Sequence, residues 1–250
     1  MIEREDADGV AIVRLAYGPV NALDLDLLGA ITETFRGLDR DGHTAVVFTG
    51  AGRAFCAGVD LWRMVEGESS YVERFLPALV DAFDAVFSCG KPVVAALNGH
   101  AIAGGCIFAA AADRRIMAAG RGRIGVSELL VGVPFPVAGL EILRHAVGEP
   151  GRQDLVLTGA THEPDEALRR GIVDEVVPAD RLPDRALEVA RQLAEIPGDT
   201  YRLTKTQLRR DALDRIARRW PAERAEVTEL WCARIADGWI RRYMERVTRR

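Results

Sequence analysis

A single glutamate in an apolar, glycine-bounded segment is the first candidate for acid–base chemistry in this sequence. Glu128 stands in the run Ile124-Gly125-Val126-Ser127-Glu128-Leu129-Leu130-Val131-Gly132. Burial disfavours the ionised form of a carboxyl group and could tune its pKa towards that of a working general base. The same pattern fits an ordinary glutamate that is capped or paired at a helix start, and the residues alone leave this alternative open.

Two turns between a strand and a helix could supply backbone hydrogen-bond donors. They are Ala54-Phe55-Cys56-Ala57-Gly58-Val59-Asp60-Leu61 and Asn98-Gly99-His100-Ala101-Ile102-Ala103-Gly104-Gly105-Cys106. The first N–H groups of a helix have no partner within it, and glycine lets another group approach the backbone closely. Two such turns that face one another could form an oxyanion hole, in which each donor is worth ~3 kcal/mol in the transition state. Glycines at such turns also occur for geometric reasons alone, so either turn by itself is weak evidence.

Other kinds of site find little support. The four histidines are scattered without paired ligand spacing, and the four cysteines form no CxxC pair, so we expect neither a metal site nor a disulfide framework. The glycines match neither a dinucleotide fingerprint nor a P-loop. The net charge of −4 gives no basic footprint for nucleic acid, and the longest apolar runs are too short to insert in a membrane. The acidic start has no signal-peptide pattern, so we expect the protein in the cytoplasm or another soluble compartment.

The elements that must position these residues alternate between strands and helices. Apolar runs predict strands at 10–15, 45–48, 92–97, 115–117 and 173–177. Helical spacing predicts helices at 22–38, with Asp24 as N-cap, and at 71–87, 104–112, 137–147, 152–157 and 165–170. After Pro178 the chain reads as almost wholly helical, with breaks at Pro197-Gly198 and at Pro221. This order indicates an α/β fold with a helical tail.

Taken together, these segments resemble the crotonase (enoyl-CoA hydratase/isomerase) superfamily. The resemblance is carried by short motifs spread from end to end: Pro19-Val20-Asn21-Ala22-Leu23, Ala57-Gly58-Val59-Asp60-Leu61, Lys91 to Gly99, Ala103-Gly104-Gly105-Cys106, Leu157-Thr158-Gly159 and Gly171-Ile172-Val173-Asp174. It implies a spiral core of ββα repeats over 1–195 and a C-terminal helical oligomerisation region over 196–250. A homotrimer, or a dimer of trimers, is the assembly that it implies.

The resemblance also implies roles for particular residues. The N–H groups of Val59 and Gly104 would hold the thioester oxygen of an acyl-CoA, and Glu128 would be the acid/base. Contacts to coenzyme A and the acyl group would come from Ala57, Gly58, Asp60, Leu61, Gly105 and Ile107. Coenzyme A would be part of the substrate, with no separate cofactor and no metal.

The type of reaction depends on one position. Enoyl-CoA hydratases resemble one another in carrying two glutamates, one of them just after the Gly-Gly-Cys step, where this chain has Ile107. A single base suffices to shift a double bond, and several motifs are similar to mitochondrial-type delta-3,delta-2-enoyl-CoA isomerases, including Gly18 to Leu23 and Tyr243-Met244-Glu245-Arg246. The sequence therefore predicts an enoyl-CoA isomerase. Hydration, another crotonase-type reaction, and non-catalytic acyl-CoA binding stay open as alternatives, as does the acyl-chain length, since Pro134-Phe135-Pro136 fits no assigned pattern.

Overall fold

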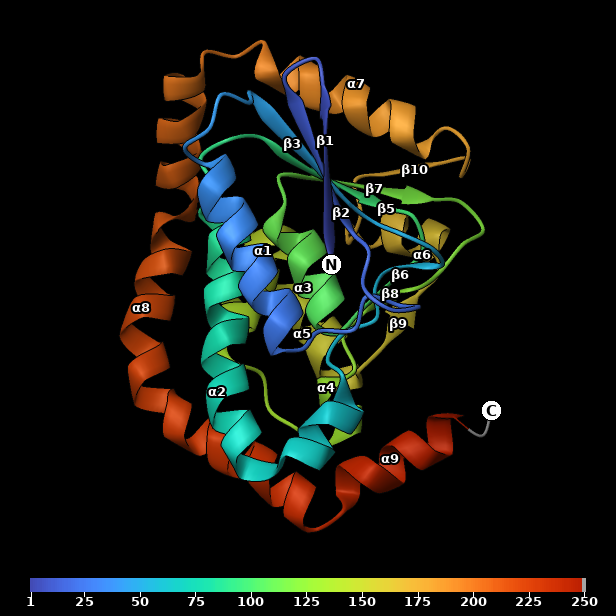
Figure 1. Ribbon diagram of the computed structural model, residues 1–250, viewed down its shortest axis with the longest axis vertical. Helices are drawn as coiled ribbons and strands as arrows, with labels where there is room; N and C mark the ends of the chain where they lie inside the picture. The colour runs from blue at the N-terminus through green and yellow to red at the C-terminus, as the bar shows by residue number, and fades with distance from the viewer. Residues whose placement is uncertain (249–250) are drawn as a thin grey trace.

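The computed structural model describes residues 1–248, in which the chain runs through successive strand–strand–helix units (Figure 1). These units are β3 (Ala45–Gly50), β4 (Ala54–Cys56) and α2 (Leu61–Phe87), then β5 (Val93–Leu97), β6 (His100–Ile102) and α3 (Gly104–Ala111), then β7 (Arg114–Ala118), β8 (Ile124–Gly125) and α4 (Glu128–Val131). In each unit the first strand joins a large sheet and the second a small sheet. This is the spiral of ββα repeats that the resemblance implies.

The large sheet has six strands in the order β1-β2-β3-β5-β7-β10, where β1 is Ile2–Ala7, β2 is Val10–Leu15 and β10 is Glu175–Val177. Only β1 is antiparallel to its neighbour, and the other strands are parallel. The small sheet has the order β4-β6-β8-β9, with β9 at Thr161–His162. Because β4, β6 and β8 run parallel, the turns that follow them leave the same edge of the small sheet.

Both faces of the large sheet are covered, as expected for parallel strands. Alternate side chains of β3 point to opposite faces. Val46 and Phe48 join the main core beneath α1 (Leu25–Leu38), α2 and α3. Ala45 and Val47 join a second cluster beneath α7 (Leu182–Ala194), which crosses the other face in Figure 1.

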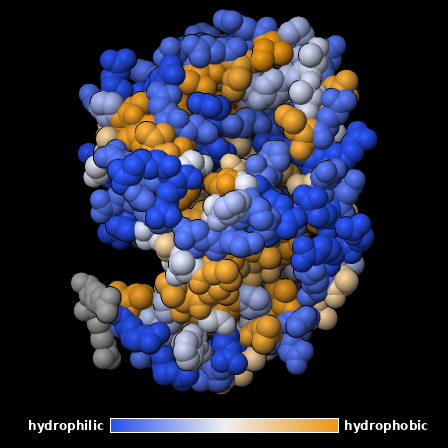
Figure 2. All heavy atoms as spheres, turned by 180° about the vertical axis from the view of Figure 1, so that it is seen from behind, coloured by the Kyte–Doolittle hydropathy of each residue, from blue (hydrophilic) through white to orange (hydrophobic). Residues whose placement is uncertain are grey.

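The remaining helices pack around these layers, and each of them adds buried side chains to the main core cluster. They are α5 (Val137–Thr158), α6 (Pro164–Arg169), α8 (Gly198–Ala236) and α9 (Trp239–Thr248). The long helix α8 runs along the outside of α2 and ends near α9 (Figure 1). From behind, the surface is hollowed between α9 and the body, and apolar side chains gather beside the hollow (Figure 2).

Buried ion pairs tie α8 to the core. Asp113, at the end of α3, accepts hydrogen bonds from Lys205 Nζ at 2.6 Å and from Arg209 Nη2 at 2.7 Å. Glu141 of α5 is fully buried and accepts from Arg215 Nε at 2.7 Å and from Arg219 Nη1 at 3.1 Å. Buried charges are tolerated when they are paired and hydrogen-bonded, so these contacts fix α8 along its length. Within residues 1–248, no helix is both long and apolar enough to cross a membrane.

The observed elements differ from the predicted ones at several places. The predictions missed β1, β4, β6, β8 and β9, of which β1 is polar and the others span only two or three residues. Helix α2 begins at Leu61 and contains a kink at Glu68, where φ is 55°, so the prediction covered only the part after the kink. The predicted segments 137–147 and 152–157 correspond to the two parts of α5, which a break at the non-helical Gly148 (φ 71°) separates as expected.

The predicted break at Pro221 is wrong, because α8 continues through it and ends at Ala236. A proline removes the hydrogen bond to the carbonyl four residues earlier, here Ala217. Ala217 and Pro221 are both exposed, so water can satisfy that carbonyl. The predicted break at Pro197-Gly198 is confirmed, since α7 ends at Ala194 and α8 begins at Gly198.

Candidate active site

The two turns predicted to supply N–H donors lie in direct contact. A Cβ placed on Gly58 would lie 2.9 Å from Ala103 Cβ and 2.9 Å from the carbonyl oxygen of Ile102. Gly58 also has φ +88°, which an L side chain rarely adopts. The parallel pairing of β4 with β6 accounts for this proximity, because both turns leave adjacent strands in the same direction. Val59 and Gly104 each follow one of the two touching residues.

The N–H group of Val59 points away from the protein segment that pairs with it. Leu23 N donates to Gly58 O at 2.8 Å, and Asp60 N donates to Leu23 O at 2.9 Å. Since successive N–H groups of an extended segment point to opposite sides, the Val59 N–H faces the side opposite Leu23. Within residues 1–248 it has no hydrogen-bond acceptor.

The N–H group of Gly104 is the first of helix α3. Its N-cap, Ala103, makes no side-chain capping bond, and in the described part of the chain Gly104 N has no acceptor either. Ala103 has φ 52° and ψ −121°, a conformation that costs non-glycine residues ~1–3 kcal/mol. Its own N–H donates to Gly125 O at 2.9 Å, which helps to hold the strained turn in place.

A cavity of about 430 Å³ opens beside the two turns, a size typical of small-molecule sites. Five of the predicted site residues line it: Ala57, Val59, Asp60, Leu61 and Glu128. The other lining residues are Pro19, Val20, Ala22, Trp62, Ile102, Ala103, Ser127, Val131, Val133, Trp231, Tyr243 and Met244. The structure thus brings the first turn, Glu128 and the last two helices to one cavity.

The other predicted site residues lie behind the lining. A Cβ on Gly104 would lie 2.7 Å from Leu23 Cδ1, and one on Gly105 would lie 2.2 Å from the carbonyl oxygen of Cys56. These glycines, like Gly58, allow the close approach of the turns and do not line the cavity. The aromatic residues Trp62, Trp231 and Tyr243 were not predicted as site residues. Nothing in the local sequence of Trp231 distinguishes a residue that lines a cavity from one that packs in the core.

Glu128 is the first residue of α4 and is 8% exposed. Its Oε2 atom is buried and has no hydrogen-bond partner within residues 1–248. Burial raises the pKa of this carboxyl from 4.5 to about 8, although hydrogen bonds from the backbone of Glu128 and Ser127 act in the opposite direction. The side chain is therefore suited to carry or accept a proton near neutral pH.

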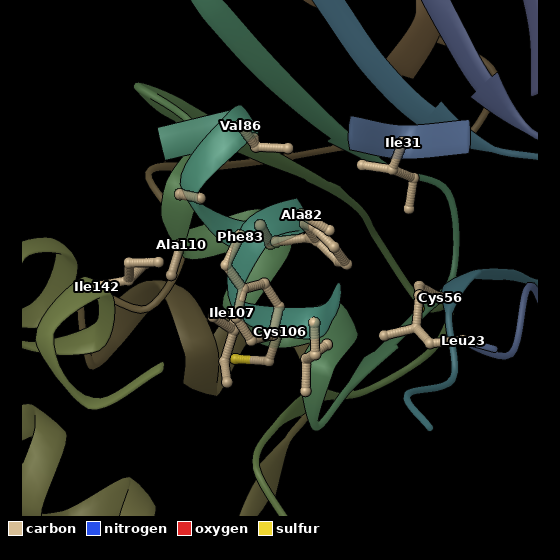
Figure 3. Close-up of a cluster of buried hydrophobic side chains, with 14 of the residues drawn as sticks. Leu23, Ile31, Cys56, Ala82, Phe83, Val86, Cys106, Ile107, Ala110 and Ile142 are labelled. Carbon is tan, nitrogen blue, oxygen red and sulfur yellow. The ribbon is translucent and has the colours of Figure 1, made fainter. Parts of the chain in front are cut away.

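Ile107 faces the core. It is 2% exposed and belongs to the main core cluster, where Figure 3 shows it with Cys106 and Ala110 of the same helix, α3, and with Phe83 of α2. Its Cδ1 atom lies so close to Gly139 of α5 that a Cβ there would be 2.8 Å away. Ile107 occupies the position that, by the resemblance, carries a glutamate in hydratases. Here that position holds an apolar side chain that packs in the core.

Cys106, next to Ile107, is fully buried, and burial together with the Glu128 charge raises the pKa of its thiol to about 12. A thiol in this state is a poor nucleophile. Within residues 1–248, no group of histidine, cysteine, aspartate or glutamate side chains could hold a metal ion. The cavity is thus lined by one buried carboxyl group and by Val59, and Gly104 lies behind the lining in the second of the touching turns; within residues 1–248 neither Val59 N nor Gly104 N has an acceptor. Such an arrangement can bind a carbonyl oxygen and move a proton on a neighbouring carbon.

Comparison with known proteins points the same way. The family model described as "Enoyl-CoA hydratase/isomerase" matches residues 5–247. "Enoyl-CoA delta isomerase 1, mitochondrial" from Mus musculus is 28% identical over 99% of this chain and 86% of its own length. A protein named "Probable enoyl-CoA hydratase" from Rhizobium meliloti is 32% identical over 78% of this chain and 74% of its own. The crystal structure of human mitochondrial delta3-delta2-enoyl-CoA isomerase superposes with a TM-score of 0.91 at 27% identity, covering 99% of this chain and 98% of that one.

Proposed function

The chain belongs to the enoyl-CoA hydratase/isomerase family, and from this premise we propose that it is an enoyl-CoA isomerase that converts 3-enoyl-CoA to 2-trans-enoyl-CoA. The observation that carries the proposal is Glu128, a buried carboxyl group with an unpaired oxygen in the cavity that Val59 lines. Isomerase-named relatives support it, and so does the apolar Ile107 in the core.

The reaction requires one base and a stabilised enolate. The Glu128 carboxylate removes a proton from C2 of the thioester, and the electron pair moves into the conjugated system to give a dienolate. In this proposal its oxygen accepts hydrogen bonds from the N–H groups of Val59 and Gly104, and the proposal is supported by the lack of any other acceptor for either group within residues 1–248. The protonated Glu128 then delivers the proton to C4, which places the double bond between C2 and C3.

Substitution of Glu128 by glutamine tests this role. Glutamine keeps the size of the side chain and cannot transfer the proton, so we expect the rate of 3-enoyl-CoA isomerisation to fall by ~100-fold or more. The rise of the conjugated 2-enoyl-CoA chromophore measures it. Glu226→Gln is the matched control, since Glu226 is exposed and does not line the cavity. Full activity of Glu128→Gln would remove Glu128 as the base.

Hydration is the second candidate, because relatives that carry hydratase names are 29% and 32% identical to the chain over 84% and 78% of its length. A lone Glu128 would then have to activate water without the second glutamate. Parallel assays of crotonyl-CoA hydration and 3-enoyl-CoA isomerisation separate the two reactions. We expect isomerisation to be the faster; faster hydration would reverse the assignment.

A further inference from the structure

The lining residues of the cavity differ in solvent exposure, which indicates how an acyl-CoA would be oriented in it. Val20, Ala57 and Leu61 of its lining are partly exposed, and we take them as its rim, whereas Val131, Val133 and Trp231 are at most 6% exposed and define its buried end. The highly polar coenzyme A moiety belongs at the solvent-facing rim. The acyl chain must then extend past Glu128 towards the buried apolar end.

The buried end is held at a fixed distance from Glu128. The N–H groups of Gly132 and Val133 both donate to Glu128 O at 3.0 Å, which closes the single turn of α4. Gly132 takes the left-handed conformation with φ 94°, and the indole of Trp239 packs over it so closely that a Cβ there would lie 2.5 Å from Trp239 Nε1. Val131 and Val133 therefore have little freedom to move away from an entering acyl chain.

Trp231 completes this end. It is 2% exposed and comes from α8, and its Nε1 donates to the carbonyl oxygen of Pro134 at 3.1 Å. The hydrogen bond fixes the indole plane, and a buried indole that lost this partner would leave a polar N–H unsatisfied. The ring is thus anchored on both sides, by α8 and by the segment that follows α4.

We propose that Trp231 is the residue that limits acyl-chain length, and that the cavity takes short acyl groups whose terminal methyl group meets the indole. This rests on the proposed function for the identity of the ligand as an acyl-CoA. It assigns a role to the Pro134-Phe135-Pro136 stretch as well, since the Pro134 carbonyl positions the indole.

Equilibrium binding of saturated acyl-CoAs tests the limit without any turnover. In the native chain, we expect affinity to rise from butyryl- to hexanoyl-CoA and then to level off or fall through octanoyl-, decanoyl- and dodecanoyl-CoA. In Trp231→Leu, the affinity should continue to rise with chain length. Each further buried methylene should increase it by about fourfold, which corresponds to ~0.8 kcal/mol of binding free energy. Trp231→Phe, which retains more of the packing, should shift the limit by a smaller step and serves if the leucine variant does not fold.

Trp220→Leu is the matched control, because Trp220 lies on the same helix and does not line the cavity. Its length profile should equal that of the native chain. A native affinity that keeps rising to dodecanoyl-CoA, or equal profiles for the Trp231 and Trp220 variants, would overturn the proposal while leaving the isomerase assignment intact. Absence of any acyl-CoA binding would overturn both, whereas binding without isomerisation would overturn only the assigned reaction.

Discussion

Burial of Glu128 raises the pKa of its carboxyl group, on which the proposed reaction depends, and it lowers the stability of the fold once the group is ionised. Burial disfavours ionisation of this carboxyl group, whose Oε2 atom has no hydrogen-bond partner in the described part of the chain, residues 1–248. In the free protein its pKa is about 8, so at neutral pH much of it is protonated. The base form, which the proposed reaction requires, becomes the main form only above that pH.

The first prediction at this scale concerns the rate. Because kcat/KM reports the ionisation of the free enzyme, we expect it to rise with pH through about 8 and then to level off, following the raised pKa of Glu128. Initial isomerisation rates at low substrate concentration across a pH series measure this. A profile that is already flat from pH ~5 upwards would mean that Glu128 ionises at its ordinary value of ~4.3.

The raised pKa of Glu128 should also make the free energy of unfolding depend on pH. A carboxyl group whose pKa is raised by folding keeps its proton in the folded state and loses it in the unfolded state between pH ~4.3 and about 8, so the fold loses stability as pH rises through this window. Glutamine does not titrate. The stability advantage of Glu128→Gln over the native chain should therefore grow across the window and become constant above it.

Urea unfolding of both proteins at several pH values measures the difference. Lys205, whose pKa burial lowers to about 8, is present in both proteins, and its contribution cancels. A difference that does not change with pH would contradict the burial of an unpaired carboxyl group.

At the scale of elements, the touching turns depend on helix α3 lying close against β4. Gly105 permits this, because a methyl group there would come within 2.2 Å of the Cys56 carbonyl oxygen, a backbone atom that cannot turn aside. We expect Gly105→Ala to lower the free energy of unfolding by ~1–3 kcal/mol or more through overpacking. It should also reduce isomerisation, since Gly104 moves with its neighbour.

Gly29→Ala on α1 is the comparison, as a Cβ there meets nothing within 4 Å. Alanine should stabilise that helix by ~0.5–1 kcal/mol. Thermal unfolding of both variants, read with their activities, gives the result. A Gly105→Ala protein as stable and active as the native chain would show that the turns need not approach so closely.

The sequence predicts helices whose apolar residues recur at helical spacing and strands formed by unbroken apolar runs. Helix α1 belongs to the first kind, with Asp24 predicted as its cap from its residue type, and β3 and β5 belong to the second. The strands β4, β6 and β8 do not, because pairs and triplets of residues have no measurable period, and only pairing in the small sheet defines them. Glu128 could be identified from its apolar surroundings, whereas Trp231 reaches the cavity only through the docking of α8.

At the scale of the whole molecule, buried ion pairs hold α8 against the core. Asp113 is the shared acceptor of Lys205 and Arg209, both almost fully buried. Removing it by Asp113→Ala would leave two buried cations without their anion, and we expect a loss of ~3–5 kcal/mol in the free energy of unfolding. Glu163→Ala, which breaks an exposed pair with Arg123, should cost less than ~1 kcal/mol.

Chemical denaturation of the two variants compares these costs directly. Equal, small effects would mean that α8 is held by apolar packing alone. Assembly into trimers through the helical region 196–250 stays a prediction, which sedimentation of the purified protein would test.

One feature of α8 bears on how this protein can change over evolution. The helix is unbroken from its anchoring cations, Lys205 and Arg209, to the indole of Trp231. Each residue of an α-helix turns the next by ~100°, so one codon gained or lost between these points would swing the indole to another side. If Trp231 limits acyl-chain length as proposed, point substitution at this position can change the accepted chain length during evolution. The number of residues between the anchoring cations and Trp231 must stay constant.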